Sequence, residues 1–198
     1  LLTYALAGSF LYRTCNNLPD SIQMGTFDEV ISRPTNPLLY LTCSGFLYGY
    51  ISHILVSIFI MALCFNNLSI TFTLTKLIFL IISIIGGAFI QGSIFLFSAV
   101  PSFWLVKSDA LRRLLWSGRE FVKYPISIYG KSVQVILTLI LPYAFINYYP
   151  AQYFLGKNDF LMFHPIFQYL TPVAGLILFG FAYIFWLNGI KNYTSTGS

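Results

Sequence analysis

Charged residues are scarce in this sequence. Aspartate, glutamate, lysine and arginine make up 9% of its 198 residues, against about 25% in an ordinary soluble domain. Apolar residues make up 57% of the chain and aromatic residues 19%. A globule of this size cannot form a polar surface with so few charged residues. Lipid must therefore cover much of its surface. The composition therefore excludes a soluble domain and indicates a membrane protein.

Ionisable groups are also missing from the long apolar segments. These segments contain no Asp, Glu, Lys or Arg, and His53 is their only ionisable residue besides Cys and Tyr. A proton-driven carrier needs a buried carboxylate or histidine relay, whereas a lone histidine is more typical of packing. Sodium coupling stays open, because carbonyls and hydroxyls can bind that ion. His164 and Asp159, in a predicted loop, do not form a catalytic constellation, which argues against a membrane enzyme.

Cysteine is rare as well. Cys15, Cys43 and Cys64 are odd in number and scattered, without the spacing of a disulfide framework or a metal site. We therefore expect no metal and no cofactor on this chain.

Five apolar segments define the expected fold. They are apolar on all sides, as membrane helices of roughly 20 residues are. The segments are Leu1–Tyr12, Gly45–Phe65, Leu77–Val106, Val133–Tyr149 and Tyr169–Leu187. The first is short, so Leu1 is interpreted as an internal start with one or more N-terminal helices missing. We predict an all-α, polytopic membrane helix bundle in which residues 1–198 form a single transmembrane domain.

Basic residues predict the orientation. The segments between alternate spans collect nine of them, and the opposite segments hold only Lys76 and Lys157. The positive-inside rule places the larger group in the cytoplasm of a multi-pass plasma-membrane protein, together with the C-terminal tail. No basic face exists outside the membrane borders, so a nucleic-acid partner is not expected. The nine residues are Arg13, Arg33, Lys107, Arg112, Arg113, Arg119, Lys123, Lys131 and Lys191.

The predicted cytoplasmic loop 14–37 contains a short amphipathic helix. Thr26 and Glu29 have the spacing of a capping box, and Asp28 and Glu29 suit a helix N-terminus. Pro34 ends the helix and disfavours a helical Arg33. Phe27, Val30 and Ile31 recur at i, i+3 and i+4 and form one apolar face. A helix this short has little stability on its own. It is either a linker on the bilayer surface or a docking element for a cytoplasmic protein, and its acidic face favours the docking element.

Two further segments flank the spans. Residues 107–125 combine an apolar stripe with basic residues that lie mainly off it, Arg112, Arg113, Arg119 and Lys123, and are typical of a basic amphipathic helix lying at the membrane surface. Residues 147–172 are aromatic but interrupted by prolines, which favours a re-entrant hairpin on the outer side. Gln91, Asn147 and Gln152 are the polar candidates for lining a transport path; pairing within the bundle is the alternative. Gly45 with Gly49, and Ser83 with Gly87, have the small-residue spacing of close helix packing.

Several runs together resemble a known family. They are GTFDEVISRPTNPLLY, FWLVKSDALRRLL with FVKYPISIYGK, LPYAFINYYPAQYFLGK and the tail KNYTSTGS. With them the chain is similar to bacterial ABC-2-type transporter permeases from about Gly25 to its end. The most specific pieces are Arg33–Pro37 and Tyr124–Tyr129.

The resemblance implies the rest of an assembly. It implies six membrane helices, of which about five are present here, and a second permease subunit, identical or homologous. It also implies two cytoplasmic ABC ATPase subunits, which would bind ATP and Mg²⁺, and a coupling helix at about Ser21–Arg33 that inserts into them. The residues expected at this ATPase interface are Thr26, Phe27, Asp28, Glu29, Val30, Ile31 and Arg33.

The expected function is therefore that of a permease subunit, not an enzyme. It would export an amphiphilic, lipid, peptide or glycan substrate by ATP-driven alternating access, with Phe27, Val30 and Ile31 seated in an ATPase groove. An ion-coupled secondary transporter is the first alternative. A membrane enzyme or a structural subunit is the second.

Overall fold

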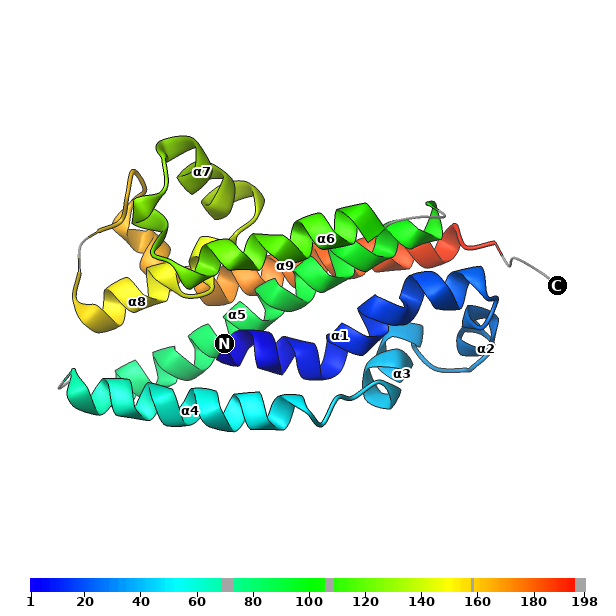
Figure 1. The fold of residues 1–198 in the computed structure, drawn as a ribbon, viewed down its shortest axis with the longest axis horizontal. Coiled ribbons are helices and arrows are strands. Elements are labelled where there is room, and N and C mark those ends of the chain that lie inside the picture. The colour runs from blue at the N-terminus through cyan, green and yellow to red at the C-terminus, as the bar shows by residue number, and fades with distance from the viewer. Residues whose placement is uncertain (69–72, 106–108, 158, 195–198) are drawn as a thin grey trace.

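The computed structural model describes residues 1–68, 73–105, 109–157 and 159–194, and every regular element in these ranges is helical (Figure 1). The long elements are α1 (Leu2–Gln23), α4 (Tyr50–Asn67), α5 (Leu74–Ala99) and α9 (Thr171–Lys191). The short α-helices are α2 (Phe27–Ile31), α3 (Pro37–Ser44), α6 (Asp109–Ser117), α7 (Lys131–Val135) and α8 (Tyr148–Leu155). Short 3₁₀ or π segments join them: η1 (Val100–Phe103), η2 (Gly118–Lys123), η3 (Ile126–Ile128), η4 (Ile136–Ile140), η5 (Tyr143–Phe145) and η6 (Pro165–Tyr169).

Three elements are long and apolar enough to cross a membrane: α4, α5 continued by η1, and α9. They confirm the second, third and last predicted spans with shifted ends. The second span begins at Tyr50 rather than Gly45, because Gly45 terminates α3 and the chain is not helical before α4. The prediction that Gly45 and Gly49 form a helix-packing motif is therefore wrong.

The two longest spans run side by side in the same direction. Phe89 contacts Phe179 with ring centroids 5.1 Å apart, and further along both helices Phe97 contacts Phe185 at 5.9 Å. Since α5 and α9 are parallel, the chain between them must return to the end of the bundle from which α5 started.

The return uses the segment predicted as the fourth span, Val133–Tyr149, but this segment is not one continuous helix. Lys131–Ile140 and Tyr143–Leu155 are bent by 78° at the break between them, as a broken span or a re-entrant loop would be. Pro142 lies at the break, and proline lacks the N–H that a continuous helix needs. The sharp bend thus lies before the segment 147–172 in which a hairpin was expected.

The first helix extends much further than its apolar sequence. We expected it to end at Arg13, but α1 continues to Gln23 with Pro19 inside it. Its second half buries Cys15, Leu18 and Ile22 against the bundle, although the other side of this half is polar. Tertiary packing therefore sustains a helix where composition alone predicted a loop.

The basic segment, expected at the membrane surface, packs one face of α6 against the bundle. The ring of Trp116 on α6 lies between Tyr12 of α1 and Phe95 of α5, with centroids at 5.0 and 5.6 Å. Its indole N–H donates to the Ser98 hydroxyl at 3.0 Å. The Arg112 guanidinium donates to the backbone carbonyl of Asn16 at 2.9 Å. Aromatic and hydrogen-bond contacts together hold α6 beside α1 and α5.

Candidate functional site

The corner between α1 and α2 lies at the end of the bundle where η1 and α9 also end (Figure 1). Gly25 makes this corner possible, because its φ of 73° lies in the left-handed region that glycine adopts without strain. The five-residue α2 follows at once, and Asn36 then starts α3. The prediction of a short helix is confirmed, since α2 has five residues.

Phe27 anchors α2 to the bundle. Its side chain is 0% exposed. Its ring makes edge contacts with Phe103 of η1 at 5.4 Å, Trp186 of α9 at 6.3 Å and Tyr193 beyond α9 at 5.2 Å. This group of Phe27, Phe103, Trp186 and Tyr193, here called the aromatic anchor, joins α2 to the ends of two spans. The prediction that Phe27 belongs to an outward apolar face is wrong.

The acidic residues of α2 are paired within the chain. The Tyr193 hydroxyl donates to Asp28 Oδ1 at 2.8 Å, which adds a polar contact to the aromatic anchor. Arg33 donates to Glu29 Oε1 at 2.6 Å across one helical turn, and this hydrogen bond raises the pKa of the guanidinium. The exposed Glu29–Arg33 pair contributes little to stability, and its groups remain accessible from outside.

The predicted capping box is absent. Thr26 has helical dihedrals, φ −69° and ψ −14°, so it lacks the extended geometry of an N-cap. Its hydroxyl donates to the Ser21 carbonyl at 3.3 Å, while the Glu29 carboxylate turns to Arg33. The spacing of Thr26 and Glu29 was right for a box, but the tight corner at Gly25 already places Thr26 in the helical region.

The residues exposed at the corner differ from those predicted for the docking face. Val30 is partly buried against the core, whereas Ile31 is 37% exposed. Met24, which sequence reasoning missed, is 76% exposed. Met24, Glu29, Ile31 and Arg33 thus form an exposed surface, here called the corner surface. Met24 precedes the periodic stretch, so no helical pattern could have pointed to it.

Two of the three predicted path-lining residues share a cavity. Gln91 of α5 and Asn147 line a cavity of about 600 Å³ together with His53 of α4 and Lys123. Lys123 pairs with Glu120 at 2.5 Å. Gln152 does not line this cavity; it is buried in α8, and its Oε1 atom lacks a hydrogen-bond partner among the described residues. A path-lining role remains a prediction for all three.

The cavity lies deep along the bundle. Gln91 is about 20 Å from Phe103 along α5 and η1 at the usual helical rise. A charged side chain such as Lys123 at that depth is expensive in lipid and typically faces water or protein. Among the described residues, no three His, Cys, Asp or Glu side chains come together to hold a metal ion.

Comparison with protein families decides the affiliation. The model of a family described as ABC-2 family transporter protein matches residues 1–197. The chain belongs to the ABC-2 transporter family. No curated protein sequence matches it, and no solved structure does. The resemblance found in the sequence is therefore confirmed over nearly the whole chain.

Membership in the ABC-2 family fixes the general role of the molecule. It is a multi-pass membrane component of an ABC transporter, a transport subunit without a catalytic domain, and it works with ABC transporter partners. The corner surface, the aromatic anchor and the polar cavity are the features of this ABC-2 component from which its mechanism can be inferred.

Proposed function

We propose that this chain is an ATP-driven export permease in which the corner surface docks on cytoplasmic ATPase subunits and the aromatic anchor carries their motion into the bundle. The burial of Phe27 is the observation that supports this most directly. A five-residue helix has almost no stability of its own. With Phe27 locked between η1 and α9, α2 moves together with the ends of α5 and α9.

The direction of force follows from what each side of α2 contacts. Phe27 is buried against the bundle, while Ile31, one turn further along the same face, is 37% exposed and Glu29 is exposed. A partner bound to the exposed residues of α2 would transmit force to the bundle through Phe27 without disrupting the contacts that Phe27 makes. Exposed charges such as Glu29 and Arg33 set orientation and encounter rate more than affinity. The apolar contribution would come from Ile31 and Met24.

The energy source is expected outside this chain. The spans lack a buried carboxylate, and Lys123 at the polar cavity is already paired with Glu120. ATP and Mg²⁺ would therefore bind the partner ATPase subunits, which lie in the cytoplasm with the α1–α2 corner and the C-terminal end. A second permease subunit, identical or homologous, would complete the path along which Gln91, Asn147 and Lys123 lie.

The substrate class follows from the lining of that path. Aromatic, hydroxyl and amide groups line the cavity beside aliphatic side chains, together with His53 and with Lys123, which pairs with Glu120. Such a lining suits an amphiphile better than a small ion. In alternating access, ATP binding would draw the ATPase subunits together, tilt α2, and open the path outward.

The test compares variants at an exposed residue and at the buried residue of α2. Ile31→Asp places a charge on the corner surface and should reduce co-purifying ATPase by about tenfold, while the melting temperature stays unchanged. Phe27→Leu should still bind ATPase but lose transport, because the anchor loosens. Phe27→Ala should cost about 3–5 kcal/mol of stability. Full ATPase recovery and full transport by Ile31→Asp would contradict the proposal.

A further inference from the structure

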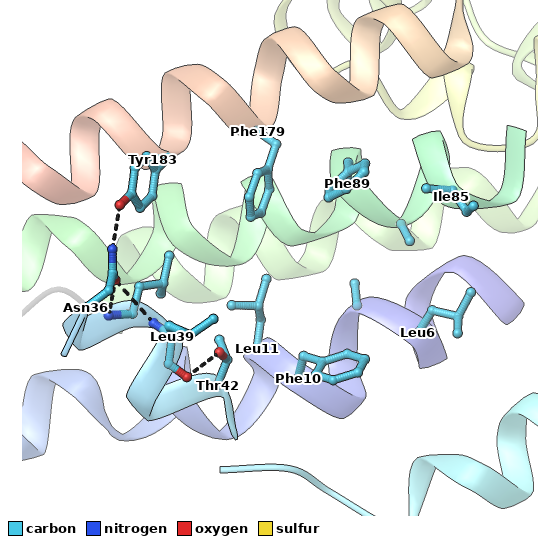
Figure 2. A pocket seen from close by; sticks show the side chains of 13 residues that line it. Leu6, Phe10, Leu11, Asn36, Leu39, Thr42, Ile85, Phe89, Phe179 and Tyr183 are labelled. Atoms are coloured by element: carbon cyan, nitrogen blue, oxygen red, sulfur yellow. Dashed lines mark hydrogen bonds between the residues drawn. The ribbon is translucent and has the colours of Figure 1, made fainter. Parts of the chain in front are cut away.

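A second cavity lies between α1, α3, α5 and α9, outside the polar cavity and the corner surface. It has a volume of about 590 Å³ and is lined almost wholly by apolar side chains. Figure 2 shows Phe89 and Phe179 on its wall and Asn36 and Tyr183 at one end. We call it the apolar groove.

The groove opens at exposed apolar side chains. Phe10 is 50% exposed, Leu39 63% and Ile85 48%, and all three line it. In a membrane-spanning bundle, apolar groups exposed at this depth face the hydrocarbon of the bilayer. The groove is thus accessible from lipid rather than from water.

The length of the groove matches one leaflet. The Phe89–Phe179 and Phe97–Phe185 contacts show which parts of α5 and α9 lie side by side. Tyr183 of α9 lies level with a position on α5 about nine residues beyond Ile85, and nine residues of helix span about 14 Å at 1.5 Å per residue. Half of a hydrocarbon core of about 30 Å is about 15 Å. The end at Tyr183 is the one nearer the α1–α2 corner. The groove therefore extends from the inner side towards the middle of the bundle.

The polar side chains of the groove are Asn36 and Tyr183 at that inner end and Thr42 of α3, whose hydroxyl donates to the Leu39 carbonyl at 2.9 Å. The Asn36 amide donates to the Tyr183 hydroxyl at 2.6 Å (Figure 2). Since the Tyr183 oxygen accepts this bond, its own proton can be donated to a ligand. One apolar length with one polar end has the shape of an amphiphile lying in the inner leaflet.

We infer that the apolar groove is the entry site for the hydrocarbon chain of a transported amphiphile from the inner leaflet, with the polar headgroup at Asn36 and Tyr183. This inference rests on the proposed export function. It deepens that function because Asn36 also begins α3, which follows α2 directly. Motion of the corner would reach the inner end of the groove through this residue.

The test uses palmitoyl-lysophosphatidylglycerol with a photoreactive diazirine on its chain, added to proteoliposomes of the purified transporter complex. Cross-linking followed by peptide mapping should label the peptides that contain Phe10 and Phe179. Ala88→Trp fills the groove and should reduce this label roughly tenfold. Leu39→Trp narrows the mouth from an exposed position, so it should reduce labelling even if Ala88→Trp fails to fold.

The matched control is Ile177→Trp. Ile177 is 53% exposed on α9 but does not line the groove, so its tryptophan should leave the label intact. The unlabelled lipid should also accelerate ATP hydrolysis by the wild-type complex and the Ile177→Trp complex, and lose this effect in Leu39→Trp.

Each other outcome overturns the inference. Equal labelling in Ala88→Trp, Leu39→Trp and the wild type would show that the chain binds elsewhere. Labelling lost in the two blocked variants, with no effect of the lipid on wild-type ATP hydrolysis, would identify a resident bilayer lipid instead of a substrate. Cross-links between two copies of the chain at Phe10 would show that a second permease covers the groove. If no ATPase co-purifies, the proposed function fails whatever the labelling shows.

Discussion

Asn36 is the single residue that both starts α3 and ties it to α9. Its Oδ1 atom accepts from the backbone N–H groups of Leu38 and Leu39 at 3.0 and 3.3 Å, and its amide donates to Tyr183. Pro37 occupies the first helical position, where a missing N–H costs nothing. A short helix without other caps depends heavily on such a residue.

The first prediction concerns this residue. Asn36→Ala removes the cap and the link to α9, and should destabilise the chain by about 1–3 kcal/mol. Tyr183→Phe removes the link alone and should cost about 0.5–1.5 kcal/mol. Asn36→Asp should stay near the wild type, because a carboxylate still caps α3 and accepts from Tyr183. Thermal unfolding in detergent measures all three; a Tyr183→Phe effect as large as that of Asn36→Ala would refute the capping role.

Local patterns in the sequence predicted correctly that α2 is a short helix with apolar and acidic residues. They did not predict which of these residues face the bundle. The i, i+3, i+4 pattern placed Phe27, Val30 and Ile31 on one side; in the structure Phe27 is buried, Val30 is partly buried and Ile31 is 37% exposed. Whether Phe27 faces a partner or the bundle depends on Phe103, Trp186 and Tyr193, which are remote in sequence. Local periodicity contains no information about these contacts.

At the scale of elements, α5 and α9 approach each other closely at their glycines. A Cβ atom on Gly175 would lie 2.3 Å from the carbonyl oxygen of Gly86, which is backbone and cannot turn away. Gly86 in turn faces the backbone of Thr171 and Pro172 at the start of α9. The two longest spans therefore cross at a pair of glycines.

The second prediction follows from this crossing. Gly175→Ala should push α5 and α9 apart and cost about 1–3 kcal/mol. Gly180→Ala is the matched control on the same helix: nothing lies within 4 Å of its added Cβ, and alanine should stabilise the helix by about 0.5–1 kcal/mol. Size-exclusion profiles after stepwise heating measure both. Similar melting temperatures for the two variants would show that the crossing is loose.

Sequence predicted the elements unevenly. Long apolar runs predicted the positions of α4, α5 and α9 within a few residues, because every turn of a membrane-spanning helix must carry apolar side chains. Small-residue spacing singled out Ser83 and Gly87, and Gly87 does lie against Thr3 of α1. The Gly86–Gly175 pair joins two distant helices and has no local spacing. The break at Pro142 was visible as a proline, but its 78° bend was not.

For the whole molecule, the parallel course of α5 and α9 determines which connections share an end. The α1–α2 corner, the end of η1 and the end of α9 meet in the aromatic anchor, so they lie on one side of the membrane. The sequence predicted this grouping from its basic residues. It grouped Lys123 with the inner end, whereas the structure places Lys123 on the lining of the cavity that also contains Gln91. A count of charges cannot distinguish a loop at the surface from one that folds back into the bundle.

The third prediction tests which side of the membrane this end faces. Cys43 and Cys64 are exposed and would be replaced by serine, while Cys15 is buried and can stay. Ser32→Cys then marks the corner end, and Lys157→Cys marks the connection after α8; both positions are exposed. A membrane-impermeant maleimide should label Lys157→Cys in intact cells.

Ser32→Cys should react only after the cells are broken open, because the proposed ATPase docking surface must face the cytoplasm. Both variants should label fully in detergent, which controls for accessibility within the fold. Labelling of Ser32→Cys in intact cells would place the corner surface outside, where no ATP-hydrolysing partner could reach it. An ATP-driven role for α2 would then be physically impossible, since the force must be applied where the nucleotide is.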